Sequence, residues 1–337
     1  PASRILLPPH ILSSHHPASA DPLGVRDSAQ FVMAQARFVS IDDAALRHVC
    51  ENFDATLRVP DWNHAYHWGD GTARTANYIL LLDALNFSFW GEPRWGITYR
   101  GEQLNGYWAL AASLKRAIEE GDDITDARVL AQMDEAHLAH ILRGDGTIPL
   151  LRERVAHTRE VGHAVLAQFD GQCARLVESC DYDAIAVIKS VVENFSSFRD
   201  EATYHGRVVK IYKRAQIFAS DLFGAYGGQQ WGALKNLDAL TCFADYKLPQ
   251  ILRRWGVMRY ADSLAARIDA FVEIAPGCDE EIEIRAATIL AVEQMRGVLA
   301  ERGVHLNSVQ IDWALWDAAQ GAPPNAKPYH RTRTIYY

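Results

Sequence analysis

Apolar residues recur at every third or fourth position over residues 280–300, and this spacing constrains the fold more than any other feature of the chain. The residues that follow it are Ile282, Ala286, Ile289, Val292, Met295 and Leu299. Such a period puts their side chains on one face of an α-helix. Acidic residues occupy positions 279–281, where negative charge complements the helix dipole. A long helix with a buried face is therefore predicted here.

A helical period also runs through residues 28–58 and 183–198. Alternation of apolar and polar residues, which marks a half-buried strand, is rare. The β content is expected to be small, with short strands around Gly96–Gly101 and Arg207–Val209. The fold class is predicted to be mostly α, a compact helical fold with minor β content.

Residues 1–30 are rich in proline and show little periodicity, so they are predicted to form an extended N-terminal arm. The pair His15-His16 could bind a metal ion, although further ligands at helical spacing are absent nearby. Residues 31–337 contain no internal repeat and no low-complexity linker. They are predicted to form a single helical catalytic domain, with two closely packed helical lobes as the alternative.

Composition narrows the classes of partner. The formal net charge is −8, whereas a nucleic-acid-binding domain normally carries a basic patch. No stretch approaches the roughly 18 consecutive apolar residues that span a bilayer. Five cysteines without a C-x-x-C pair argue against a disulfide framework or a zinc knuckle. With no signal peptide recognised, a cytoplasmic protein is expected.

The common sequence motifs for nucleotide cofactors and nucleophiles are missing. There is no G-x-G-x-x-G after a strand, no G-x-x-x-x-G-K-[ST], no G-x-S-x-G and no H-E-x-x-H. Chemistry must then rest on carboxylates, on lysine or arginine, and on a shaped pocket. This indicates hydrolysis or lyase chemistry without a metal, and no cofactor is expected.

Several unusual strings recur in a fixed order along the chain. They are LNFSFW at 85–90, YKRAQ at 212–216, TCFADYKLPQ at 241–250, EIR at 283–285, DWALWD at 312–317 and HRTRTIYY at 330–337. In order and spacing they resemble the queuosine salvage protein family, the queuosine 5′-phosphate N-glycosylase/hydrolases. The resemblance covers roughly residues 30–337.

This resemblance implies an N-glycosyl hydrolase that releases the base queuine from queuosine 5′-monophosphate, for salvage into tRNA modification. It also implies a helical fold related to the helix-hairpin-helix DNA glycosylases, without a metal or redox cofactor. The expected partners are the small-molecule substrate and its product. Direct nucleic-acid binding and membrane binding are not expected.

The resemblance makes Asp245 and Lys213 the candidate catalytic residues. Glycosylases of the related fold place a lysine and an aspartate about thirty residues apart across a hairpin, and these two are 32 residues apart. Cleavage of an N-glycosidic bond builds positive charge on the ribose, which a carboxylate can stabilise or attack. Lys213 is expected either to bind the 5′-phosphate or to lie close to Asp245. An exposed lysine on a polar helix face is the alternative.

Pro249 is expected in the first turn of a helix that begins just after Asp245. The positive end of that helix would keep the carboxylate ionised. From the residues alone, Asp245 could instead merely cap the helix. The resemblance favours the catalytic role.

Asp312 and Asp317 are predicted to hold the base. A 7-deazaguanine has carbon in place of N7, so its departure cannot be assisted by protonation there, and the enzyme must hold its amide edge. Carboxylates suit the N1–H and 2-amino donors, and a second carboxylate suits the cationic aminomethyl arm. Five residues apart on a helix, the pair would flank a ligand. Two solvated helix carboxylates are the alternative.

Phe243 is the predicted stacking residue for the flat base, and Ala244 and Trp313 complete the predicted substrate-binding set. Ordinary burial is the alternative for Phe243. Core packing is the favoured interpretation for Trp313 and its neighbour Trp316.

Other polar residues are assigned structural roles. Asn86 is interpreted as a hydrogen-bond hub rather than a substrate contact. Arg285 follows Glu281 by four residues, which predicts a helix-surface ion pair in preference to a phosphate ligand. Residues 330–337 are expected to lock the tail of the chain onto the body.

Two other functions compete with hydrolysis of a nucleotide. A nucleic-acid glycosylase or binding module on the same scaffold would need a basic groove and a base-flipping wedge, which the net charge disfavours. A non-catalytic queuine carrier would bind the free base and leave the nucleotide intact.

Overall fold

A computed structural model describes residues 21–53, 57–321, 323 and 326–337 of the chain. Helices account for 54% of the protein and strands for 9%, so the predicted mostly α class is confirmed. The suggestion of a metal at His15-His16 concerns residues outside the described ranges. In the part of the chain that the structure describes, each helix is too short or too polar to cross a membrane.

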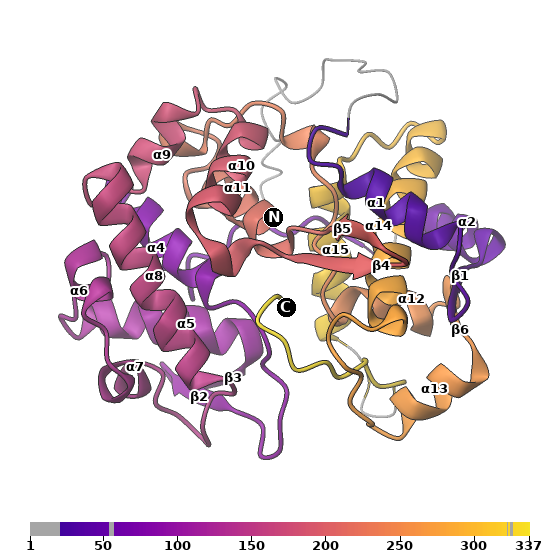
Figure 1. Ribbon diagram of the computed structural model, residues 1–337, viewed down its shortest axis with the longest axis horizontal. Helices are drawn as coiled ribbons and strands as arrows, with labels where there is room; N and C mark the ends of the chain where they lie inside the picture. The colour runs from indigo at the N-terminus through magenta and orange to yellow at the C-terminus, as the bar shows by residue number, and fades with distance from the viewer. Residues whose placement is uncertain (1–20, 54–56, 322, 324–325) are drawn as a thin grey trace, which may run out of the picture.

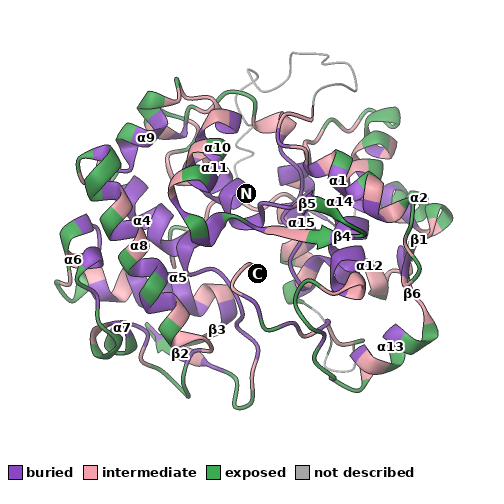
Figure 2. Ribbon diagram, viewed as in Figure 1, coloured by how far each residue is buried: buried purple, intermediate pink, exposed green. Residues whose placement is uncertain are grey.

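The helices form two groups that face each other (Figure 1). The first group contains α4 (Ala73–Ala84), α5 (Gly106–Glu119), α6 (Ala127–Ala131), α7 (Glu135–Ile141), α8 (Leu151–Phe169), α9 (Ala174–Ser179), α10 (Ala184–Asn194) and α11 (Lys213–Ala225). The second contains α1 (Val25–Met33), α2 (Asp43–Glu51), α12 (Lys247–Arg254), α13 (Asp262–Asp269), α14 (Asp279–Glu301) and α15 (Ser308–Gln320). One continuous cluster of buried apolar residues runs through both groups, and Figure 2 shows the buried faces turned inward.

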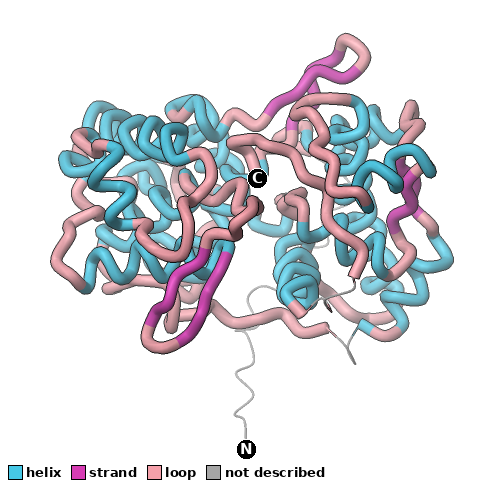
Figure 3. The backbone as a smooth tube through the Cα atoms, turned by 90° about the horizontal axis from the view of Figure 1, so that it is seen from below, coloured by secondary structure: helices cyan, strands magenta, loops and turns pink. Residues whose placement is uncertain are grey.

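The strands form three small antiparallel ladders at separate places on the helical body (Figure 3). The pairs are β1 (Val39–Ile41) with β6 (Met258–Tyr260), β2 (Gly96–Tyr99) with β3 (Glu102–Asn105), and β4 (Glu201–Tyr204) with β5 (Arg207–Lys210). Both predicted strand regions are therefore confirmed. Three short 3₁₀ turns, Ser196–Phe198, Gln230–Gly232 and Leu237–Ala239, lie between longer elements.

The beginning of the described chain differs from the predicted arm. Residues 25–30 belong to α1, whose buried face packs on α14. The carboxylate of Asp21 accepts hydrogen bonds from the backbone N–H groups of Val25 and Asp27, which satisfies two donors that a helix start leaves free. The extended-arm prediction is thus wrong for residues 25–30. The helical period over 28–58 is likewise interrupted, because β1 separates α1 from α2.

Helix α14 confirms the strongest periodic signal, but it is buried on more than one face. Residues 281–289 are buried without a break, including two glutamates and an arginine. Glu283 is buried because its carboxylate accepts hydrogen bonds from the backbone N–H groups of Arg37, Phe38 and Val39. It also accepts one from the Tyr204 hydroxyl. A charged side chain can occupy the core when its hydrogen bonds are satisfied in this way.

The last residues of the chain run between the two groups of helices (Figure 1). The carbonyl of Tyr337 accepts a hydrogen bond from the backbone N–H of Ser88 at 2.9 Å. The Tyr337 ring is buried, and its hydroxyl lies 3.1 Å from Nε2 of His330. Arg331 and Arg333 pair with Glu92 and Glu273. The predicted locking of the tail onto the body is confirmed.

Candidate active site

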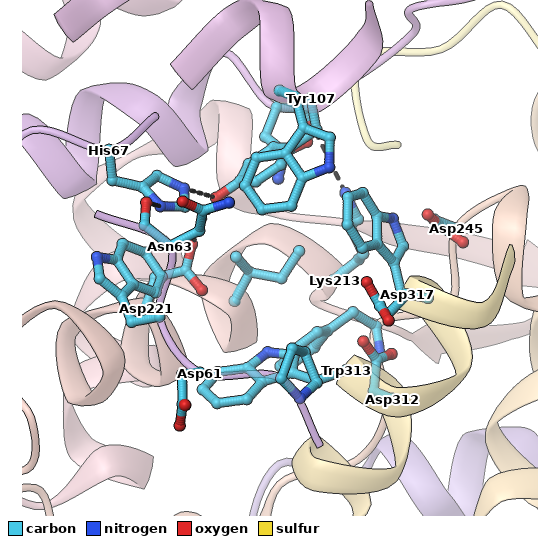
Figure 4. Close-up of a pocket in the computed structure, with 17 residues that line it drawn as sticks. Asp61, Asn63, His67, Tyr107, Lys213, Asp221, Asp245, Asp312, Trp313 and Asp317 are labelled. Carbon is cyan, nitrogen blue, oxygen red and sulfur yellow. Dashed lines mark hydrogen bonds between the residues drawn. The ribbon is translucent and has the colours of Figure 1, made fainter. Parts of the chain in front are cut away.

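A cavity of about 190 Å³ lies where the two groups of helices meet (Figure 4). It brings together Lys213, Phe243, Asp245, Asp312, Trp313 and Asp317. These are all the predicted site residues except Ala244, whose side chain is buried away from the cavity. Within the described residues, no group of three or more His, Cys, Asp or Glu side chains is arranged to hold a metal ion.

Asp245 combines two roles that the sequence offered as alternatives, capping a helix and lining a pocket. Its Oδ1 atom accepts hydrogen bonds from the backbone N–H groups of Lys247 at 2.7 Å and Leu248 at 2.9 Å. Pro249 lies in the first turn of α12, as predicted. Oδ2 makes no hydrogen bond with any described residue, which leaves this oxygen free for a ligand in the cavity.

The segment that carries Asp245 is held by side chains from three helices. The backbone N–H of Thr241 donates to Gln216 on α11, and the N–H of Phe243 donates to Asp312 on α15. The carbonyl of Ala244 accepts from Nε of Arg285 on α14. Ala244 therefore contributes a backbone contact that fixes the segment beside the cavity.

Lys213 is buried at the start of α11, so the alternative of an exposed surface lysine is wrong. Its ammonium donates to the carbonyl of Asn86 at 3.2 Å. Burial lowers the pKa of Lys213 to about 8, against the opposing effect of the negative charge on Asp245. Lys213 and Asp245 therefore form an electrostatically linked pair in the cavity wall.

The electrostatics of Asp245 differ from the expectation that the helix would govern them. Burial of the carboxyl raises its pKa, while the charge of Lys213 and the two N–H groups of α12 lower it, and the net direction is upward. Desolvation outweighs the helix terminus because the carboxyl has little contact with water. The charge of Lys213 is the largest of the effects that favour the ionised form of Asp245.

Asp312 and Asp317 differ in burial although both line the cavity from α15 (Figure 4). Asp312 is 3% exposed, and its Oδ1 accepts from the N–H of Phe243 at 2.7 Å. Burial raises the pKa of Asp312 well above its usual range, and the negative charge of Asp245 adds to this effect. Asp317 is exposed at the rim. The alternative of two solvated carboxylates is therefore wrong for Asp312.

Aromatic rings form much of the cavity wall. Trp313 and Trp316 line it, so they are not confined to core packing as the sequence had favoured. Trp316 meets Trp108 of α5 in an edge-to-face contact with 5.5 Å between ring centroids. Trp62 stacks on His67 at 4.0 Å. Such walls suit a flat ligand.

A hydrogen-bonded chain that the sequence did not predict closes the side of the cavity away from Asp245 (Figure 4). Nδ1 of His67 lies 2.9 Å from the carbonyl of Asn63, so this nitrogen carries the proton. Burial lowers the pKa of His67 to about 3, and the ring is neutral. Nε2 must then accept the proton of the Tyr107 hydroxyl, 2.8 Å away.

The chain of polar groups continues from Tyr107 to Asp221. The Tyr107 oxygen lies 3.3 Å from Oδ2 of Asp221. The Tyr107 hydroxyl therefore lies within hydrogen-bond distance of two acceptors, Nε2 of His67 and the carboxylate of Asp221. Burial raises the pKa of Asp221 to about 7. Behind it lies Asp83, whose oxygens find no protein donor and whose pKa is also raised by burial and by the charge of Asp221. The two buried carboxyls are therefore electrostatically coupled, and the charge of Asp221 favours the protonated form of Asp83.

Sequence signals for these residues were present. Asp83 and Asp221 are single carboxylates in the apolar strings YILLLDAL and FASDLFG, and an isolated charge in a buried run needs a specific explanation. Residues 60–67 combine aromatic and polar side chains without periodicity. That composition is typical of a binding loop.

Two structural interpretations require correction. The Asn86 side-chain amide makes no hydrogen bond with a described residue, so it is not a hub, and it lines the cavity instead. Arg285 is buried rather than exposed and forms a two-bonded ion pair with Asp200, while Glu281 lies farther away at 3.7 Å. Arg285 therefore supports the core behind the site.

Comparisons with known proteins match the same region. The model of the family described as queuosine salvage protein matches residues 66–337. A queuosine 5′-phosphate N-glycosylase/hydrolase from Sphaerobacter thermophilus is 49% identical, over 94% of this chain and 98% of its own length. A protein of the same name from Mus musculus is 36% identical, over 94% of this chain and 99% of its own length. Another, from Schizosaccharomyces pombe, is 32% identical, over 93% of this chain and 99% of its own length.

Proposed function

The chain belongs to the queuosine salvage protein family, and on that premise we propose that it hydrolyses the N-glycosidic bond of queuosine 5′-monophosphate and releases queuine. The observation that carries the proposal is the Asp245 carboxylate. One of its oxygens is held by the start of α12, and the other is free beside Lys213 in an aromatic cavity.

In this proposal, the ribose lies against Asp245. As the bond from C1′ to the base nitrogen breaks, its electron pair leaves with the base and positive charge develops on the sugar. The carboxylate either stabilises that charge or bonds to C1′ and is then displaced. Water supplies the new C1′ oxygen, and its proton balances the departing base. Lys213 keeps Asp245 ionised through its charge.

The base is proposed to lie between Trp313 and Phe243 on the wall and the carboxylates of α15. Asp312 accepts from the donors of the amide edge. Its raised pKa is consistent with this role, because ligand N–H groups would favour the ionised form that burial disfavours. Asp317, exposed at the rim, is suited to the cationic aminomethyl arm.

The extent of the catalytic domain and its relation to a known fold are part of the same proposal. Residues 31–337 act as a single helical catalytic domain that takes a small nucleotide rather than a nucleic acid. A relation to the helix-hairpin-helix glycosylases is supported by the positions of Lys213 at the start of α11 and Asp245 just before α12. Gly227 and Gly228 lie between them, both with positive φ.

The proposal is tested with two substitutions of Asp245 that separate its charge from its capping bonds. Asp245→Asn keeps an oxygen that can accept from the N–H groups of Lys247 and Leu248, so the fold should persist. Asp245→Ala removes both charge and cap. Release of queuine from queuosine 5′-monophosphate, followed by chromatography, should be lost in both variants.

Asp262→Asn, on the exposed start of α13, is the matched control and should keep full activity. Thermal unfolding of Asp245→Asn should match that of the parent protein within a few degrees. A parent protein that bound queuine without cleaving the nucleotide would leave the carrier function as the better explanation. An active Asp245→Asn variant would remove Asp245 from the mechanism.

A further inference from the structure

Buried cations surround the backbone of residues 83–88, at the end of α4. The carbonyls of this segment all accept hydrogen bonds from the side chains of Arg154, Lys213 and Arg214. Arg214 donates to the carbonyls of Asp83 and Ala84, Arg154 to those of Leu85, Phe87 and Ser88, and Lys213 to that of Asn86. The proposed catalytic lysine is therefore one member of a larger set of cations.

The two arginines have no carboxylate as a direct partner. Arg154 is 0% exposed and Arg214 is 1% exposed, and neither forms an ion pair within the described residues. The ring of Phe87 lies against both guanidiniums, with its centre 4.2 Å from Cζ of Arg154 and 5.2 Å from Cζ of Arg214. A buried charge needs compensating hydrogen bonds, so the carbonyls and the ring take the place of a carboxylate.

The positions of the three cations oppose the local preference of a helix. Lys213 and Arg214 are the first two residues of α11, and Arg154 lies in the first turn of α8. Positive charge at a helix start is unfavourable because of the helix dipole. The end of α4 compensates for it, since the last carbonyls of a helix carry partial negative charge and lack partners within the helix. An arrangement that breaks a local rule in this way is expected at a functional site.

Arg154 holds the Asn86 carbonyl from both sides. Its Nη1 donates to the carbonyl of Leu85, and its Nη2 donates to that of Phe87, so the planar fork straddles the peptide between them. In the described part of the chain, the Asn86 carbonyl is the only hydrogen-bond acceptor of the Lys213 ammonium, at 3.2 Å. The place of this acceptor is thus fixed by an arginine on another helix.

Other charged groups face the Lys213 ammonium from several elements. The acidic ones are Asp83, Asp221, Asp245 and Asp312, and the cationic ones are Arg214 and Arg285. These attractions and repulsions act over a distance and define no single direction. The hydrogen bond to the Asn86 carbonyl does define one, because it is short and directional. The position of this carbonyl therefore decides where the ammonium lies relative to Asp245.

We propose that Arg154 and Arg214 are positioning residues for the hydrolysis, because they fix residues 83–88 so that the Asn86 carbonyl holds the Lys213 ammonium beside Asp245. The inference rests on the proposed function and assigns residues outside the cavity to the same reaction. Arg154 acts most directly, since its fork bonds the carbonyls on both sides of Asn86. Neither arginine lines the cavity.

The test removes the fork of Arg154 without removing its charge. In Arg154→Lys, a point cation cannot bond both flanking carbonyls, so the Asn86 carbonyl can turn away from Lys213. The pKa of Lys213 should then fall, because its charged form loses a hydrogen bond. The alkaline limb of kcat/KM should move down by about one pH unit. At neutral pH, kcat should fall roughly tenfold and KM should change by less than about threefold.

Arg116→Lys is the matched control. Arg116, on α5, also donates to two backbone carbonyls, those of Ile141 and Arg143, and it lines neither cleft. Its substitution should lower thermal stability but leave the alkaline limb in place. If Arg154→Lys lowered stability and kcat with the alkaline limb unmoved, Arg154 would have a structural role only and the inference would be overturned.

A titration of Lys213 itself separates this inference from the proposed function. Lysine carrying ¹³C at Cε is incorporated, and the NMR signal of Lys213 is assigned by its absence in Lys213→Arg. Its midpoint is expected near 8 in the parent protein, lower in Arg154→Lys and unchanged in Arg116→Lys. Phe87→Leu, which removes the ring against both guanidiniums, should lower the midpoint by less, and it decides the question if Arg154→Lys does not fold.

The two failures are then distinct. If the parent protein cleaves no nucleotide but the midpoint of Lys213 falls as expected, the proposed hydrolysis fails and the positioning of Lys213 stands. If hydrolysis proceeds and the midpoint is the same in the parent, Arg154→Lys and Phe87→Leu, the positioning role is refuted while the proposed function remains.

Discussion

Arg285 and Asp200 form a two-bonded ion pair inside the protein, with Nη1 2.8 Å from Oδ1 and Nη2 2.6 Å from Oδ2. The pair reaches both proposed catalytic residues through the backbone. Asp200 also accepts a hydrogen bond from the N–H of Lys213, and Arg285 donates one to the carbonyl of Ala244, next to Asp245. The buried pair therefore connects the backbone of Lys213 to the segment that carries Asp245.

Loss of Asp200 should strongly destabilise the protein. Asp200→Ala removes the two-bonded partner of the buried Arg285 and leaves only Glu281 at 3.7 Å; breaking a buried pair in this way typically costs about 3–5 kcal/mol. Urea denaturation measures the free energy of unfolding. Arg100→Ala, which breaks an exposed pair with Glu119, serves as the control and should cost less than about 1 kcal/mol. Similar losses in the two variants would contradict the structural role of the buried pair.

The rate of queuine release should pass through a maximum with pH. Below it, protonation of Asp245 removes the negative charge, and burial raises the pKa of this carboxyl above its ordinary value of 3.8. Above it, Lys213 loses its proton near pH 8, and Asp245 loses its counter-ion. The measurement is kcat/KM against pH in constant ionic strength. Lys213→Arg should move the alkaline limb to higher pH, because arginine stays charged. A parent profile that stays flat above pH 9 would rule out this role for Lys213.

Asp221 should make stability depend on pH in the neutral range. Its pKa is raised to about 7 in the folded protein, so the folded state binds more protons than the unfolded state between the two pKa values. The contribution is fully present below the unfolded pKa and is lost as pH rises through about 7. Denaturation midpoints at pH 5 and pH 8 measure this loss.

Asp221→Asn provides the matched variant for that measurement. Its amide does not titrate and keeps an oxygen that can accept from the Tyr107 hydroxyl, so the difference in stability between pH 5 and pH 8 should shrink. Asp83→Asn should also reduce it, because Asp83 is electrostatically coupled to Asp221. An unchanged pH dependence in both variants would show that the pair does not hold the extra proton.

Base recognition should respond to Asp312 more than to Asp317. Asp312→Asn retains an oxygen that can accept from the N–H of Phe243 but loses the charge facing the base, so free queuine should inhibit roughly tenfold more weakly. Asp317 is exposed, and its substitution by Asn should have a smaller effect because water screens the lost charge. Neither change should alter the ratio of nucleotide to nucleoside hydrolysis. Inhibition constants that did not move in either variant would exclude both carboxylates from base binding.

Local periodicity predicts the helices of this chain well and their environment less well. The spacing over 280–300 correctly indicated α14, since a 3.6-residue period is a property of the segment itself. It could not indicate that residues 281–289 are buried without a break, because the partners of Glu283 and Arg285 lie in distant segments. In the same way, the i, i+4 spacing of Glu281 and Arg285 suggested a surface pair, while Asp200 is the nearer partner.

The sequence likewise predicts one part of the candidate site and not the other. The family motifs that contain Lys213, Asp245 and the residues of α15 are recognisable in the sequence. The structure brings these motifs together at one cavity. The residues on the far side, Asn63, His67, Tyr107 and Asp221, belong to no single string. Their hydrogen-bonded chain exists only after three separate segments pack together, so sequence spacing carries little information about it.

The cavity takes Trp62 and Asn63 from early in the chain and Asp312 and Asp317 from α15, about 250 residues later. Contacts between residues this far apart form late in folding. The chain loses conformational entropy when the intervening loop closes, before these contacts can stabilise it. During synthesis, where the N-terminal part emerges first, the first group of helices can assemble while α15 is still inside the ribosome. Under the proposed function, the chain is expected to become active only after α15 docks, because α15 carries Asp312 and Asp317.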